Sequence, residues 1–210
     1  MIQNHYFYID KTKFIKEWWE NGDAVTLITR PRRFGKTLNM SMVEQFFSVE
    51  YADRGELFAG LSIWQEKAFG GEEAPDGDYK YRKLQGTFPV ISLSFAKVKE
   101  NNFTGAKKQI CQIITEAYNR YDFLADSDCL NQNEKEAFWE VSPEMEDYRA
   151  TNSINVLSNY LHRYYGKKVL ILLDEYDTPM QEAYVHGYWK EIVDFIKGMF
   201  NATFKTNPYL

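Results

Sequence analysis

The stretch LITRPRRFGKTLNMS, residues 27–41, decides the fold because it places a loop between an apolar run and an amphipathic one. The apolar run, residues 24–29 (AVTLIT), predicts a buried strand, and the residues after the loop predict a helix. Gly35-Lys36-Thr37 closes the loop directly before that helix. This order is typical of a phosphate-binding loop, although the usual glycine five positions before Gly35 is replaced here by Arg30, which Pro31 follows.

The loop has the chemistry to bind phosphate in spite of this change. Pro31 donates no backbone N–H, but the residues after it do, and they lead into the positive end of a helix dipole. Lys36 is expected to reach the outer phosphates, and the Thr37 hydroxyl is expected to ligate Mg²⁺. The residues expected to line the nucleotide are Arg32, Arg33, Phe34, Gly35, Lys36, Thr37 and Leu38. The alternative is a chance Gly-Lys-Thr tripeptide beside a solvated basic turn.

A pair of carboxylates supplies the second half of the expected site. The apolar run 169–173 (VLILL) ends in Asp174-Glu175, so both side chains follow the C-terminal end of a predicted buried strand, where open α/β sheets bind ligands. Asp174 is expected to hold Mg²⁺, and Glu175 to orient or deprotonate an attacking water. A strand that simply meets solvent would look the same. Asp177 could be a further carboxylate of the site or the N-cap of a helix that begins before Pro179.

The alternation of apolar runs with helical periods predicts an α/β domain with a mainly parallel sheet. A third run, residues 90–95 (VISLSF), predicts another strand, and residues 70–86 read as a polar surface insertion. Helices are predicted by the apolar stripes Leu38, Met42, Phe46; Ile110, Ile114, Ala117; Ile154, Leu157, Leu161; and Trp189, Ile192, Ile196. Gly166 is expected to end the third of these helices.

The composition argues against several classes of protein. A net charge of -5 argues against a chain built to coat nucleic acid or anionic membrane. Two cysteines imply no disulfide framework, and the sequence contains no apolar run long enough for a membrane helix. We therefore expect a cytoplasmic protein with no membrane association, and 210 residues suit a single domain.

The strings FYIDKTKFI, LITRPRRFGKTLNMSMVEQFF, FPVISLSF and VLILLDEYDTPMQEA resemble the bacterial and archaeal AAA-ATPase-like family, whose members often carry a PD-(D/E)XK nuclease-like domain. The resemblance implies a P-loop NTPase fold, a three-layer αβα sandwich, in which Arg-Pro is the usual start of the phosphate loop. It maps residues 35–37 onto the phosphate loop and Asp174 and Glu175 onto the Walker B pair. Asp10-Lys11-Thr12 matches a family signature of unassigned role, and capping of a helix over 13–19 by Asp10 or Thr12 is the simpler account.

Family members continue beyond the point where this sequence ends, into a strand expected to carry a sensor residue. We therefore expect residues 1–210 to be one domain of a longer protein, truncated at its C-terminus. The function expected is ATP binding with Mg²⁺ and, in the intact protein, hydrolysis that drives a conformational change. The alternatives are a nucleotide-gated scaffold that hydrolyses nothing and a small-molecule phosphotransferase. Further copies of the chain, or nucleic acid bound through the missing region, are the other expected partners.

Overall fold

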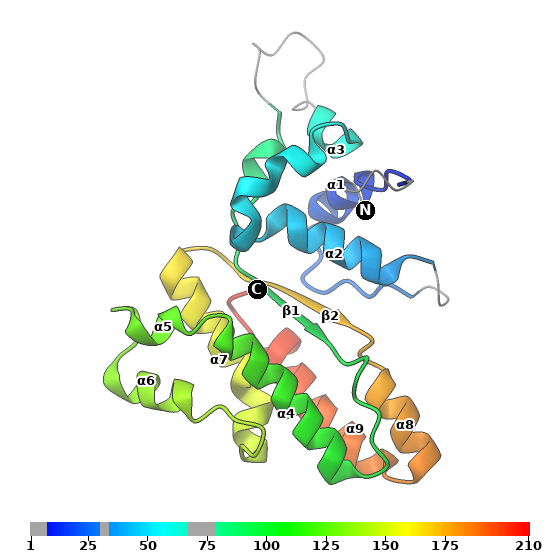
Figure 1. Cartoon of the computed structure of the whole chain (residues 1–210), viewed down its shortest axis with the longest axis vertical. Helices are drawn as coiled ribbons and strands as arrows, with labels where there is room; N and C mark the ends of the chain where they lie inside the picture. Colours follow the sequence, from blue (N-terminus) through cyan, green and yellow to red (C-terminus); the bar gives the residue numbers. More distant parts are fainter. Residues whose placement is uncertain (1–7, 30–33, 67–78) are drawn as a thin grey trace. The chain divides into compact units, whose positions relative to one another are not determined.

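The structure is a computed structural model that describes residues 8–29, 34–66 and 79–210. The chain divides into two compact units, residues 1–90 and residues 91–210 (Figure 1).

The first unit is helical in its described part. Its elements are α1 (Lys13–Asn21), α2 (Lys36–Phe47), the 3-10 helix η1 (Val49–Phe58), α3 (Ser62–Gln65) and η2 (Arg82–Leu84). The predicted helix after Gly-Lys-Thr is confirmed as α2, and its apolar stripe is buried: Met42, Val43, Phe46 and Phe47.

Aromatic side chains form the core of this unit. Phe47 lies between Trp19 of α1 and Phe88, with ring centroids 5.4 Å and 5.8 Å away, and Phe46 packs edge-on against Phe58 at 5.0 Å. The backbone of residues 86–88 pairs with the end of α2, where the Phe88 N–H donates to the Phe47 carbonyl. These contacts hold α1, α2 and η1 together.

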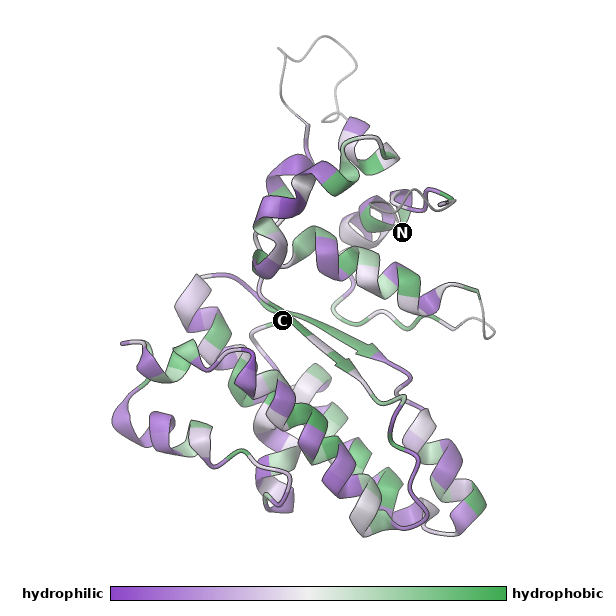
Figure 2. Cartoon of the chain, viewed as in Figure 1, coloured by the Kyte–Doolittle hydropathy of each residue, from purple (hydrophilic) through white to green (hydrophobic). Residues whose placement is uncertain are grey.

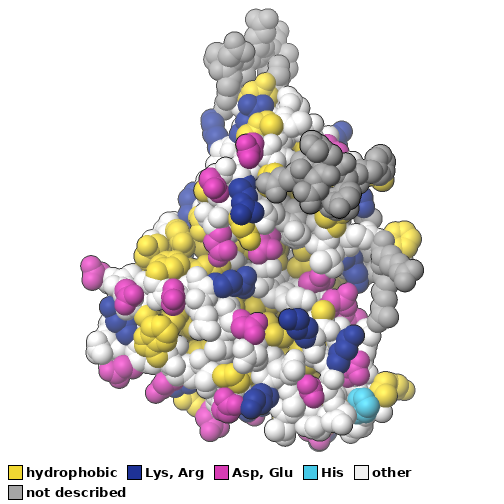
Figure 3. Space-filling view, in the orientation of Figure 1, with side chains coloured by type: hydrophobic (Ala, Val, Ile, Leu, Met, Phe, Trp, Pro, Cys, Tyr) yellow, Lys and Arg dark blue, Asp and Glu magenta, His cyan; other side chains and the backbone are white. Residues whose placement is uncertain are grey.

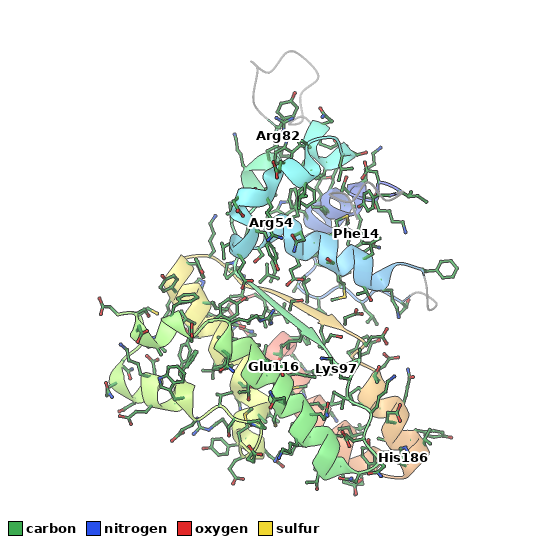
Figure 4. All side chains as sticks on the ribbon, viewed as in Figure 1. Phe14, Arg54, Arg82, Lys97, Glu116 and His186 are labelled. Atoms are coloured by element: carbon green, nitrogen blue, oxygen red, sulfur yellow. The ribbon has the colours of Figure 1, made fainter. Side chains whose placement is uncertain are left out.

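The end of the segment 70–86 is packed into the unit. Residues 67–78 lie outside the described residues, but Tyr81 is buried and its hydroxyl bonds to Glu20. Arg82, labelled in Figure 4, donates to the Trp64 carbonyl and lies over the Tyr79 ring, 3.4 Å from its centroid. The described residues 79–86 are thus a packed segment rather than a surface insertion.

The predicted strand over residues 24–29 is wrong. These residues have no regular secondary structure in the described chain, and Val25 and Leu27 are 55% and 63% exposed. A strand needs a neighbour that takes up its backbone N–H and C=O groups. Among the described residues, the sheet consists of β1 and β2, which pair with each other. The apolar run therefore lacks a strand to pair with, and Thr26 instead accepts a hydrogen bond from the Trp18 indole at 3.1 Å.

The second unit contains most of the sheet. Strand β1 (Val90–Ser94) crosses the boundary between the units, and β2 (Leu170–Asp174) lies parallel beside it. The helices are α4 (Phe103–Asn119), α5 (Phe123–Asp126), α6 (Gln132–Trp139), α7 (Asp147–Tyr165), α8 (Thr178–His186), α9 (Trp189–Phe200) and the π-helix η3 (Asn201–Lys205). The strands predicted at 90–95 and 169–173 and the three remaining helices are confirmed.

The core of this unit lies between the sheet and the long helices. Helix α9 packs against α4, α7 and α8, and one continuous apolar cluster runs from Ile91 of β1 through Ile110 and Leu157 to Met199. Figure 2 shows both strands as apolar ribbons, while the helices carry apolar and polar residues on different faces. Gly166 ends α7 as predicted, with φ 63° and its N–H donating to the His162 carbonyl.

Strand β2 is half-buried along its whole length, whereas the sequence predicts full burial. Directly before the strand, the Val169 N–H donates to the Tyr209 carbonyl at 2.7 Å, so the chain around Tyr209 lies beside Val169. The α/β class, with about 60% helix and a small parallel sheet, is confirmed. The three-layer P-loop sandwich stays a prediction.

Candidate functional site

The predicted site residues fall into both units. Phe34, Gly35, Lys36, Thr37 and Leu38 lie at the start of α2 in the first unit, and Asp174 and Glu175 follow β2 in the second. Arg32 and Arg33, like Arg30 and Pro31, lie outside the described residues. The two groups of residues lie in different units, so the surroundings of each group are those of its own unit.

Gly35 turns the chain into α2. Its backbone is left-handed, with φ 77° and ψ 24°, a conformation that glycine adopts without the steric cost of a Cβ. The Asn39 N–H donates to the Gly35 carbonyl at 2.9 Å, which is the first hydrogen bond of the helix. The helix thus begins at Lys36, and the first backbone N–H groups lie on the side of Gly35.

The start of α2 suits an anion. Gly35 occupies the N-cap position without a side chain that could accept a hydrogen bond, and the first turn of the helix carries no acidic residue. The partial positive charge of the helix dipole is therefore not offset within that turn. Lys36 is half-buried, and Thr37 and Phe34 are exposed. The residues described here fit a phosphate group by their chemistry.

Asp10 and Thr12 join the first helix to α3. The Asp10 carboxylate accepts hydrogen bonds from the N–H and hydroxyl of Ser62, at 2.7 Å and 2.6 Å, and from the N–H and hydroxyl of Thr12. Thr12 in turn accepts from the Ile63 N–H at 3.0 Å. Partial burial alone would raise the pKa of Asp10, but the bonds from Ser62 and Thr12 lower it to about 2.

The expected capping of the first helix is therefore corrected. Thr12 does hold the N-cap position of α1, but its side chain makes no capping bond to that helix. The side chains of Asp10 and Thr12 instead bind the start of α3, because Ser62 and Ile63 present their backbone N–H groups there.

Lys11 lies between these two anchored residues and beside Gly35. A Cβ placed on Gly35 would lie 3.4 Å from the Lys11 Nζ atom. Tyr8, three residues earlier, donates from its hydroxyl to the Met42 Sδ atom of α2 at 3.3 Å. The segment 8–12 thus contacts α2 at two places. Sequence reasoning noticed Asp10-Lys11-Thr12 but gave it no connection to the loop.

Asp174 and Glu175 end β2 in an unusual conformation. Asp174 is the last residue of the strand, and its carbonyl accepts from the Phe95 N–H at 3.0 Å. Glu175 has φ 49°, and among the described residues it alone has a positive φ without being a glycine. Its own N–H donates to an Asp174 carboxylate oxygen at 3.0 Å. A long side chain in the left-handed region is strained, and such strain concentrates at functional sites.

Asp177 holds the N-cap position of α8, which is one of the two positions expected from the sequence. Its side chain makes no capping bond there. Its carboxylate accepts from the Gln181 side chain at 2.7 Å instead. Asp177 is therefore engaged with its own helix.

A bound Mg²⁺ would take its ligands from few protein groups here. No cluster of three or more His, Cys, Asp or Glu side chains that could hold a metal occurs within residues 8–29, 34–66 and 79–210. Mg²⁺ is usually held by one or two protein oxygens together with substrate phosphates and water, so it needs no such cluster. The Thr37 hydroxyl and the Asp174 carboxylate are donors of the required kind.

Comparison with known proteins identifies relatives over the whole sequence. A family model described as "Predicted AAA-ATPase" matches residues 1–210. A protein of Azotobacter chroococcum mcd 1, named "Uncharacterized protein in vnfD 5'region", is 27% identical over 198 residues, which cover 94% of this chain. The aligned part is 31% of that relative, so the chain spans about a third of its length. No solved structure matches the chain.

Within the described ranges, no helix combines the length and the apolar character that crossing a bilayer requires.

Proposed function

The chain belongs to the predicted AAA-ATPase family, and we propose that it binds ATP with Mg²⁺ through the loop that leads into α2. The observation that carries the proposal is the start of α2, where a left-handed Gly35 precedes Lys36 and no acidic residue occupies the first turn. Backbone N–H groups, the helix dipole and a lysine then act on one phosphate group together.

Each residue of the loop has a role in this proposal. Lys36 binds the β- and γ-phosphates, and Arg32 and Arg33 add positive charge before the helix. The backbone of Phe34 and Gly35 provides N–H groups that approach the phosphates closely. Thr37 and Leu38 begin the helix, and the Thr37 hydroxyl is a ligand for Mg²⁺.

The carboxylates after β2 have their own roles in the proposal. Asp174 holds Mg²⁺ directly or through water, and Glu175 accepts the proton of an attacking water. When bound, Mg²⁺ would neutralise negative charge on the phosphates. Support for a role of Glu175 in the chemistry comes from its strained backbone, which a purely structural glutamate at a strand end does not need. Hydrolysis in the intact protein would drive a conformational change.

Calorimetric titration with Mg-ATPγS tests the binding step. We would compare the full-length protein with Lys36→Ala, and with Lys13→Ala as a control, because Lys13 is an exposed lysine of the same unit. Loss of charge-assisted bonds to phosphate should weaken binding by at least about tenfold in Lys36→Ala and leave Lys13→Ala unchanged. Equal affinities of the wild type and Lys36→Ala would refute the assignment of the loop.

A second candidate is a nucleotide-gated binding module that hydrolyses no ATP. It is favoured by residues 24–29, which form no strand before the loop, whereas a working phosphate loop is normally held by one. Rates of ATP hydrolysis separate the two candidates. An active wild type whose Glu175→Gln variant is inactive supports the ATPase. A wild type that binds nucleotide but, like Glu175→Gln, hydrolyses no ATP above background supports the binding module.

Other expected properties remain predictions of the sequence. These are the cytoplasmic location, self-association, and nucleic-acid binding through a further region. On the face shown in Figure 3, basic and acidic side chains of the described residues are interspersed, which gives that face no extended basic surface for nucleic acid.

A further inference from the structure

The structure brings a second lysine to the start of α2. The Nζ atom of Lys11 lies 3.4 Å from where a Cβ on Gly35 would stand, so the ammonium lies against the residue that precedes Lys36. Lys11 is separated from Gly35 by 24 positions in the sequence, which is why no local motif predicts the contact.

The neighbours of Lys11 anchor the backbone from which its side chain extends. Asp10 is held by the N–H and hydroxyl of Ser62, and Thr12 by the N–H of Ile63. Tyr8 contacts Met42 on the next turns of α2. The backbone on both sides of Lys11 is therefore anchored by contacts that do not involve its own side chain, and the Nζ atom lies beside Gly35.

The Lys11 ammonium at this place is electrostatically unfavourable unless an anion is present. The start of α2 already carries the positive end of the helix dipole, and a cation there is unfavourable. The adjacent Asp10 carboxylate makes its hydrogen bonds to Ser62 and Thr12 and forms no ion pair with Lys11. No ion pair joins Lys11 to a described residue. A negatively charged ligand at Gly35 would turn this repulsion into attraction.

We propose that Lys11 is a second phosphate-binding ammonium of the site, acting beside Lys36 on the terminal phosphates of a nucleoside triphosphate. This inference rests on the proposed function, since it assigns a further residue to the same loop. The Asp10-Lys11-Thr12 segment then has two tasks. Asp10 and Thr12 hold the segment against α3, and Lys11 contacts the ligand.

The test uses Lys11→Met, which keeps the length of the side chain and removes its charge. The matched control is Lys13→Met, two positions further on, where the side chain is exposed. In full-length protein, Lys11→Met should weaken Mg-ATPγS binding by about tenfold or more, as expected for a lost charge-assisted bond. It should also reduce the dependence of the affinity on salt concentration, and Lys11→Arg should restore part of the affinity. Lys13→Met should bind like the wild type.

The stability of the ligand-free protein distinguishes this role from a structural one. Removing a cation from the positive end of α2 should leave the midpoint of thermal unfolding unchanged or raise it. A lower midpoint, with weaker binding and an unchanged salt dependence, would show that Lys11 merely supports the fold and would overturn the inference.

A labelling experiment on the wild type does not depend on whether any variant folds. Acetylation of lysines, followed by mass spectrometry, should show Lys11 protected by Mg-ATPγS and Lys13 unprotected. If Lys36→Ala abolishes binding while Lys11→Met binds like the wild type and Lys11 stays unprotected, this inference fails and the proposed function stands. If the wild type binds no Mg-ATPγS at all, both fail.

Discussion

The left-handed backbone of Glu175 makes a prediction about stability that depends on no bound ligand. Glu175 has φ 49°, and a Cβ in this region approaches the following carbonyl oxygen. Glu175→Gly removes that Cβ, and Glu175→Ala retains it. Both variants lose the same carboxylate, including its 3.5 Å contact with the Thr178 hydroxyl, so the difference between them isolates the backbone effect.

The expected size of the difference follows from two opposing terms. The left-handed conformation costs a residue with a Cβ about 1–2 kcal/mol. Glycine in turn loses about 0.4–1 kcal/mol relative to alanine, because its unfolded chain has more conformations. The glycine variant should therefore be more stable than the alanine variant by roughly 1 kcal/mol, or about 2–4 °C in the midpoint of unfolding.

The neighbouring residue provides the control. Asp174 lies in the extended strand β2, where glycine weakens the structure, so Asp174→Gly should be less stable than Asp174→Ala by about 0.5–1 kcal/mol. Urea or thermal unfolding of the four variants measures both differences. The opposite order at the two positions is the diagnostic result. If alanine is the more stable residue at position 175 as well, the backbone of Glu175 is not strained and the argument for its functional role loses its support.

The remaining predictions concern the first unit. Gly86→Ala should lower the free energy of unfolding by more than about 2 kcal/mol in a urea titration, since Gly86 has φ 66° and a Cβ there would lie 2.3 Å from the Ala52 Cα atom. Gly60→Ala, where a Cβ would meet no atom within 4 Å, should change it little, and a similar loss in both variants would contradict the packing described. The hydrogen bonds from Ser62 and Thr12 lower the pKa of Asp10 to about 2 in the folded protein. The ionised Asp10 carboxylate should therefore stabilise the fold fully above the pKa near 4 that it has in the unfolded chain. This stabilisation should be lost as the pH falls towards 2. Unfolding at a series of pH values should then show a smaller loss of stability between about pH 4 and pH 2 for Asp10→Asn than for the wild type, and parallel curves would refute it.

Much of the fold was determined by local sequence. Helices α2, α4, α7 and α9 follow from apolar residues at helical spacing, and Gly166 ends α7 because glycine accepts φ 63°. Strands β1 and β2 follow from short apolar runs. The site residues 34–38 and the pair Asp174 and Glu175 stay predictions from their spacing, which rest on the residue types that phosphate and Mg²⁺ require at neighbouring positions.

Only the tertiary structure decided the contacts that join residues distant in sequence. Residues 24–29 have the composition of a strand, but a strand forms only where another supplies its hydrogen bonds, and none does so among the described residues. Asp10 and Thr12 could cap their own helix, yet they bind α3, because Ser62 and Ile63 bring unpaired N–H groups to them. The approach of Lys11 to Gly35 arises in the same way. Local sequence specifies backbone preference and chemistry, whereas the groups that satisfy a hydrogen bond or face a charge are set only when the chain has folded.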